Sequence, residues 1–138
     1  MPDLLYTARL ATRWGDMDAL GHVNNSVYFT YAEQARIEWL LRHAGESWDK
    51  TMGPILARIT MDFKRPVVYP ATLVVTLSIE RVGSTSFTVR HDIAIEGNEE
   101  TIYATGEAVL VWVDYETGKP VPLPEVLQEA LAVPPQPR

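Results

Sequence analysis

The segment from Asp16 to Asn25 holds the densest set of reactive side chains in the chain, including the carboxylates of Asp16 and Asp18 and the imidazole of His22. It precedes a stretch with helical spacing, and a helix start offers unpaired N–H groups and partial positive charge, which suit a carbonyl oxygen becoming an oxyanion. A carboxylate just upstream could attack that carbonyl or activate water against it. Gly21 can bend the loop so that Asp18 faces the helix. Such an Asp also commonly caps a turn, and the residues alone leave that alternative open.

Other chemistries find less support. Asp16 and Asp18 could offer oxygen ligands to a divalent metal, but no further carboxylates cluster with them, and the histidines His22, His43 and His91 lack ligand spacing. The chain has no cysteine, which excludes thiol nucleophiles and disulfides. Serine-hydrolase, phosphate-loop and dinucleotide fingerprints are missing from the sequence. We therefore expect neither a metal nor a cofactor, and we expect His91, on an apolar strand face, to be a core histidine.

The elements around this loop are predicted from hydrophobic spacing. Alternation from Tyr6 to Trp14 indicates a half-buried strand with both aromatic residues on one face. Apolar residues at three- and four-residue steps predict a helix from Ser26 to His43. Further alternation predicts four strands with short connections and then a short helix, at 55–63, 73–79, 87–95, 101–114 and 125–132. This order indicates an α+β fold, and Gly106 inside the last strand predicts a bulge or a tight contact.

Length and composition limit the remaining possibilities. With 138 residues, the chain is expected to form a single domain over 1–138, with a mobile Pro-rich tail at 132–138. Its net charge of −6 and lack of a basic run argue against a duplex nucleic-acid partner. No signal peptide or membrane-length apolar run is visible, so we expect a cytoplasmic protein that does not bind membranes. The strand at 101–114 is apolar on both faces, which favours burial against a second copy.

The run Trp14-Gly15-Asp16-Met17-Asp18-Ala19-Leu20-Gly21-His22-Val23-Asn24-Asn25-Ser26-Val27-Tyr28-Phe29 resembles the signature of hot-dog-fold acyl-CoA thioesterases. The resemblance is to the 4-hydroxybenzoyl-CoA thioesterase family and its short bacterial acyl-CoA branch. It continues through Glu33 and Arg36, and more weakly through 63–66 and 83–87. The resemblance implies a hot-dog fold, in which a curved, mostly antiparallel five-stranded sheet wraps one long helix. It also implies hydrolysis of an acyl-CoA or acyl carrier protein thioester to a carboxylic acid and a thiol.

The resemblance also assigns roles to single residues. Asp18 matches the family's catalytic aspartate, a nucleophile or general base, and the N–H of Asn25 matches the group that polarises the thioester carbonyl. Asp16 would have a supporting role at most. The pocket around the carbonyl would be shaped by Gly21, His22, Val23 and Asn24. The family's site lies at a dimer interface, lined by the partner's second and third strands, so we expect a homodimer or a homotetramer.

One departure from the family leaves the carrier open. Some members hold the CoA phosphates with basic residues at positions that here read Gly83, Ser84 and Thr85. The basic residues that could replace them are Arg58, Lys64, Arg65, Arg81 and Arg90. The carrier is therefore CoA or acyl carrier protein, and the acyl group is aliphatic or aromatic. Two other functions stay open: a hot-dog hydratase or dehydratase acting on acyl thioesters, and a non-catalytic acyl-thioester-binding dimer.

Overall fold

One antiparallel sheet forms the frame of the molecule. The computed structural model describes residues 3–132, and the strands follow the order β1-β4-β5-β6-β2, with β3 paired to β6 beside this path. Every pairing between these strands is antiparallel. The elements are β1 (Asp3–Ala11), α1 (Asn25–His43), β2 (Met52–Ile59), β3 (Asp62–Phe63), β4 (Thr72–Val82), β5 (Ser86–Ile95), β6 (Ala104–Asp114) and α2 (Glu125–Leu131).

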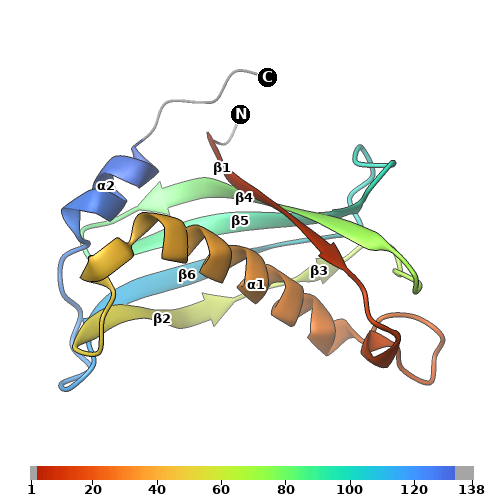
Figure 1. Cartoon of the computed structure of the whole chain (residues 1–138), viewed down its shortest axis with the longest axis horizontal. Coiled ribbons are helices and arrows are strands. Elements are labelled where there is room, and N and C mark those ends of the chain that lie inside the picture. The colour runs from red at the N-terminus through yellow and green to blue at the C-terminus, as the bar shows by residue number, and fades with distance from the viewer. Residues whose placement is uncertain (1–2, 133–138) are drawn as a thin grey trace.

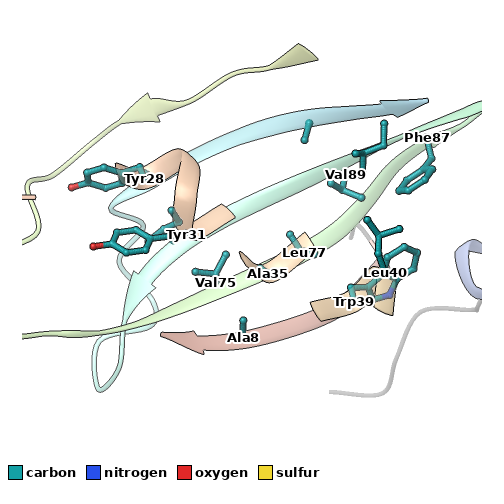
Figure 2. Close-up of a cluster of buried hydrophobic side chains, with 14 of the residues drawn as sticks. Ala8, Tyr28, Tyr31, Ala35, Trp39, Leu40, Val75, Leu77, Phe87 and Val89 are labelled. Atoms are coloured by element: carbon teal, nitrogen blue, oxygen red, sulfur yellow. The ribbon is translucent and has the colours of Figure 1, made fainter. Parts of the chain in front are cut away.

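The long helix α1 lies along one face of the curved sheet (Figure 1). Its buried side chains meet the strands in one continuous core (Figure 2). The helix contributes Tyr28, Tyr31, Ala35, Trp39 and Leu40, and the sheet contributes Ala8, Val75, Leu77, Phe87 and Val89. The predicted α+β class and the hot-dog arrangement are confirmed, because one helix covers one face of a curved antiparallel sheet.

The start of α1 is set by a local cap. The Asn24 side chain accepts a hydrogen bond from the Ser26 N–H, and the helix begins at Asn25, one residue before the predicted start. It ends at His43 as predicted. Gly45 follows with a φ of +55°, a conformation that glycine adopts readily after a helix end. The local signals in the sequence therefore place the helix correctly.

The strand predicted over 55–63 is interrupted. Strand β2 ends at Ile59 and β3 begins at Asp62, so the sheet has six strands in place of the expected five. Between β2 and β3, the backbone at Thr60 lies against Gly106 of β6. A Cβ built on Gly106 would lie 2.0 Å from the Thr60 carbonyl oxygen. The tight contact predicted at Gly106 is therefore confirmed. Only a residue without a side chain lets the two backbones approach this closely.

The first strand begins and ends three residues before the strand predicted from Tyr6 to Trp14, and this changes the position of Trp14. Strand β1 ends at Ala11, and Trp14 opens a single turn of 3-10 helix, Trp14–Asp16. The side chain of Trp14 is 78% exposed, so the prediction that Trp14 lies in this strand, on one face with Tyr6, was wrong. The alternating pattern cannot register this change, because the turn is set by contacts of Asp16.

A short helix, α2, follows the sheet at the C-terminal end of the described residues. Helix α2 ends at Leu131, close to the prediction, and the expected mobile tail, 132–138, lies outside the described residues except for Ala132. Within 3–132, neither helix combines the length and the apolar character needed to cross a membrane.

Candidate active site

The loop between β1 and α1 turns back on itself. The Asp18 N–H donates to the His22 carbonyl, and the Gly21 N–H donates to the Asp18 carbonyl, each at 3.1 Å. Gly21 has a φ of +91°, which a residue with a Cβ rarely adopts. The bend predicted at Gly21 is therefore present, and it returns the chain to the start of α1 beside Asp18.

The carboxylate of Asp18 is held in one orientation by two hydrogen bonds. Its Oδ1 accepts from the Leu20 N–H at 2.9 Å, and its Oδ2 accepts from the Asn24 Nδ2 at 3.1 Å. The side chain is half-buried. An ionised carboxylate has about four lone-pair sites, so Asp18 keeps acceptor capacity for a water or an electrophile on its open side.

The Asn24 amide connects this carboxylate to the helix. Its Oδ1 accepts from the Ser26 N–H at 2.9 Å, which caps α1. Because an N–H donor faces the amide oxygen, the amide nitrogen must be the atom that faces Asp18. One side chain therefore satisfies the helix start and orients the carboxylate.

The N–H of Asn25 is the free donor at the start of α1. Asn25 is the first helical residue and is exposed. Within residues 3–132, no group accepts a hydrogen bond from its N–H. The positive end of the helix dipole lies at the same point. This donor, next in sequence to the asparagine that holds Asp18, can polarise a carbonyl oxygen.

Asp16 is a structural carboxylate. It is 2% exposed and accepts from the Arg13 N–H at 2.9 Å, from the Arg13 guanidinium at 3.0 Å and from the Tyr31 hydroxyl at 2.7 Å. Burial acts to raise the pKa of Asp16, but the hydrogen bonds from the Arg13 backbone, from Tyr31 and from the Arg13 side chain outweigh it, so the pKa lies below its ordinary value. Asp16 thus ties the loop to α1 from inside the protein.

A second segment, 64–71, is hydrogen-bonded to the loop and to α1. The Val23 N–H donates to the Val67 carbonyl at 2.8 Å, and the Val67 N–H donates to the Tyr28 hydroxyl at 3.2 Å. Val23 is 1% exposed, so it anchors the loop and does not itself face solvent. These contacts bring residues 64–71 beside the start of α1.

Two hollows open at this junction. One has a volume of about 580 Å³ and is lined by Trp14, Gly15, Met17, Asp18, Ala19 and Tyr69. The other has a volume of about 260 Å³ and is lined by His22, Asn25, Tyr28, Phe63, Lys64, Arg65 and Pro66. The carboxylate of Asp18 thus belongs to the first hollow, and the start of α1 belongs to the second.

The predicted basic residues divide between distant places. Lys64 and Arg65 lie in the hollow beside Asn25. Arg58 is exposed on β2, whose outer edge is unpaired in the described sheet. Arg81 lies near the end of β4 that leads to β5, about 30 Å along the strand from Thr72 at the loop end. This end of β4 lies beside α2, and Figure 1 shows α2 and the β1–α1 loop at opposite ends of the sheet. Arg90 forms an ion pair with a neighbouring carboxylate, that of Asp92, at 3.1 Å.

Sequence reasoning did not select two aromatic residues of this site, Trp14 and Tyr69. Trp14 was expected on a strand, and Tyr69 lies in the connection between β3 and β4, where spacing carries no information about contacts. Both side chains are exposed, at 78% and 39%. The signal available in the sequence was an aromatic residue immediately before the acidic loop.

Comparisons with known proteins agree with this architecture. The family model of the thioesterase-like superfamily matches residues 12–131. The structure is similar to that of PA2801 from Pseudomonas aeruginosa, with a TM-score of 0.90 and 36% identity, covering 94% of this chain and 100% of that chain. It is also similar to XC229 from Xanthomonas campestris, a candidate acyl-CoA thioesterase, with a TM-score of 0.75 and 38% identity over 81% of this chain and 95% of that chain.

A similarity in sequence extends to a named enzyme. The long-chain acyl-CoA thioesterase FadM of Escherichia coli is 25% identical over 125 residues, which cover 89% of this chain and 94% of FadM. The family model includes the loop with Asp18, the helix α1 and all strands after it. This chain therefore belongs to the thioesterase-like superfamily.

Proposed function

We propose that this protein hydrolyses an acyl-CoA thioester to a carboxylic acid and a free thiol, with Asp18 and the Asn25 N–H as the catalytic groups. Membership of the thioesterase-like superfamily and the similarity to FadM support the reaction class. The single observation that carries the assignment of residues is the Asn24 side chain, which caps α1 and donates to the Asp18 carboxylate. This side chain places a carboxylate beside the free donor of a helix start.

The chemistry follows from these two groups. The carbonyl oxygen of the thioester accepts a hydrogen bond from the Asn25 N–H, which stabilises the negative charge that develops there. Asp18 then either attacks the carbonyl carbon, releasing the thiolate and leaving a mixed anhydride for water to hydrolyse, or removes a proton from a water that attacks directly. In both routes the net change is the addition of one water across the C–S bond.

The positive charges of Lys64 and Arg65 indicate where the carrier part of the substrate binds. Lys64 and Arg65 are exposed in the hollow that contains Asn25, where they can face the phosphates of CoA or of a phosphopantetheine arm. They take the place of the basic residues missing at 83–85. Arg58, on the neighbouring strand β2, is available to the same site in a second copy.

We further propose that the active form is a homodimer or a tetramer built from homodimers. Strand β2 is one of the two terminal strands of the described sheet, and its Ile55 and Leu56 are 44% and 43% exposed. An exposed apolar edge strand promotes pairing with another chain. Two copies joined along β2 would bring Arg58 of one copy near the other copy, and a mass measurement in solution distinguishes the dimer from the tetramer.

The test is thiol release from a panel of aliphatic and aromatic acyl-CoAs, measured with the wild type, Asp18→Asn and Glu116→Gln. Glu116 is exposed in the turn after β6, so Glu116→Gln is a matched loss of one carboxylate away from the loop. We expect wild-type release that falls at least a hundredfold in Asp18→Asn and is unchanged in Glu116→Gln. Near wild-type kcat in Asp18→Asn would refute the assignment.

Two further readouts address the alternative functions. A hydratase would consume an enoyl thioester without releasing thiol, and a binding protein would saturate with ligand and release none. After a single turnover in water labelled with heavy oxygen, label in the Asp18 carboxylate would establish nucleophilic attack, because the general-base route puts the labelled oxygen only into the acid product.

A further inference from the structure

The two hollows at the start of α1 differ in chemistry. The hollow that contains Asn25 also holds the cations of Lys64 and Arg65 and the imidazole of His22. Among the described residues that line the hollow containing Asp18, only Asp18 carries a charged side chain. The two parts of a thioester substrate differ in the same way, because the carrier is anionic and a simple acyl group is apolar.

The walls of the Asp18 hollow are aromatic and adaptable. Trp14 and Tyr69 come from segments far apart in the chain, and Met17 lines the space as a flexible apolar side chain. Trp14 is 78% exposed, although an indole is among the most costly side chains to leave in water. Burial of an apolar ligand against this indole would remove that surface from water.

The backbone turn that carries Trp14 is held by hydrogen bonds of the buried Asp16. The 3-10 turn Trp14–Asp16 is held by Asp16, whose carboxylate is bonded to the Arg13 N–H and to the Tyr31 hydroxyl of α1. On the other side, the Thr12 N–H donates to the Ala71 carbonyl at 2.9 Å, which joins the chain before Trp14 to the end of the segment that carries Tyr69. These contacts therefore hold in place the two backbone segments that carry the walls of the hollow.

We propose that the hollow between Trp14 and Tyr69 binds the acyl group of the substrate and selects unsubstituted apolar chains. The bound carrier extends in the other direction, over Lys64 and Arg65. This inference rests on the proposed thioesterase function and specifies the substrate of that site. An acyl group that carries a free carboxylate is rejected, because Asp18 repels this carboxylate and no cation lines the described hollow. In this proposal the thioester carbonyl binds between Asp18, which lines the first hollow, and Asn25, which lines the second.

The test compares kcat/KM for straight-chain acyl-CoAs from butyryl to lauroyl, together with succinyl-CoA, in four proteins. These are the wild type, Trp14→Ala, Trp14→Phe and Leu41→Ala, in which Leu41 is an exposed apolar residue near the other end of α1. For the wild type we expect kcat/KM to rise up to about fourfold per methylene while the chain still gains contact. Butyryl-CoA is expected to exceed succinyl-CoA by about tenfold or more.

The variants decide the location of the acyl group. Trp14→Ala is expected to flatten the dependence on chain length, Trp14→Phe to restore most of it, and Leu41→Ala to retain the wild-type profile. A uniform loss across all chain lengths in Trp14→Ala, or a preference for succinyl-CoA, overturns the proposal. Loss of the wild-type oligomer in Trp14→Ala also overturns it, because the hollow would then be covered by a second copy.

Failure of this inference is distinguishable from failure of the proposed function. If the wild type releases thiol and Asp18→Asn does not, the thioesterase stands whatever Trp14→Ala shows. If the wild type releases no thiol from any acyl-CoA, the function itself fails, and the acyl-site proposal fails with it.

Discussion

The side-chain amide of Asn24 donates to the carboxylate of Asp18 at 3.1 Å, while its oxygen accepts the Ser26 N–H at the start of α1. The orientation of the carboxylate thus depends on the same side chain that begins the helix. A substitution that keeps the cap and removes the amide can separate the two roles.

We expect Asn24→Ser to retain stability and lose activity. Serine is a good N-cap, so the free energy of unfolding should stay within about 0.5 kcal/mol of the wild type. Loss of a hydrogen bond to a charged group, worth about 1.5–3 kcal/mol, predicts a fall in kcat of about 10- to 100-fold. Asn24→Ala should lose the cap as well, at about 1 kcal/mol. Wild-type kcat in Asn24→Ser would show that Asp18 is oriented without Asn24.

Asp16 predicts a stability effect that depends on pH. Its pKa is lowered from the ordinary value of 3.8, so its contribution to stability is fully present above that value and is lost as pH falls through the lower folded-state pKa. We expect Asp16→Asn to lower the free energy of unfolding by about 2 kcal/mol at neutral pH. The difference in unfolding free energy between Asp16→Asn and the wild type should become smaller below about pH 4. Urea unfolding of both proteins from neutral to acidic pH measures this difference, and a difference that is constant with pH would contradict the prediction.

His91 predicts a second pH dependence, in a higher range. The side chain is fully buried. Burial and, to a smaller extent, Arg36 lower the pKa of His91, the Thr60 carbonyl and Asp92 oppose them, and the resulting pKa is about 4. The unfolded chain therefore binds a proton near pH 6.5 that the folded protein does not accept until near pH 4. Acidification across this window should remove about 3 kcal/mol of stability, with no further change from His91 below it.

The histidine variants test this assignment. The unfolding free energy of His91→Gln should depend less on pH between 4 and 6.5 than that of the wild type. His43→Gln, which removes the exposed histidine at the end of α1, is the matched control for the loss of one histidine. An unchanged slope in His91→Gln would mean that another group takes up the proton.

Gly106→Ala should be strongly destabilising. The added Cβ would lie 2.0 Å from the Thr60 carbonyl oxygen and 2.8 Å from the His91 Nε2. Because the first of these atoms belongs to the backbone, β6 or the link between β2 and β3 must move, at a cost of about 3 kcal/mol or more. Gly15→Ala, whose Cβ meets no atom within 4 Å, should stay within about 0.5 kcal/mol of the wild type. Thermal unfolding of both variants measures the difference.

Lys64 and Arg65 predict a change in binding of the carrier. The double variant Lys64→Ala/Arg65→Ala should raise KM for acyl-CoA about tenfold and reduce its dependence on salt, because two cations facing phosphates are lost. KM for the matching acyl-pantetheine, which has no phosphate, should not change. Lys119→Ala, which removes an exposed cation beyond β6, is the control. Equal effects on both thioesters would place the phosphates elsewhere.

Local signals in the chain were sufficient for much of the fold. The three- and four-residue spacing predicted α1 to within one residue. A glycine before the helix predicted the turn at Gly21, and a glycine within a strand predicted the contact at Gly106. These features depend on the conformational preferences of neighbouring residues, which are present in the sequence itself.

The set of residues that come together at the site could be identified only from the tertiary structure. Segment 64–71 reaches the loop through the hydrogen bond from Val23 to Val67, and this contact brings Lys64 and Arg65 beside Asn25 while Arg81 stays near the other end of β4. Trp14 turns outward because Asp16 bonds to Tyr31, a residue of the following helix. Spacing along a chain specifies which face of an element a residue occupies. It carries no information about which distant segment will pack against that face, because that depends on the free energy of the whole core.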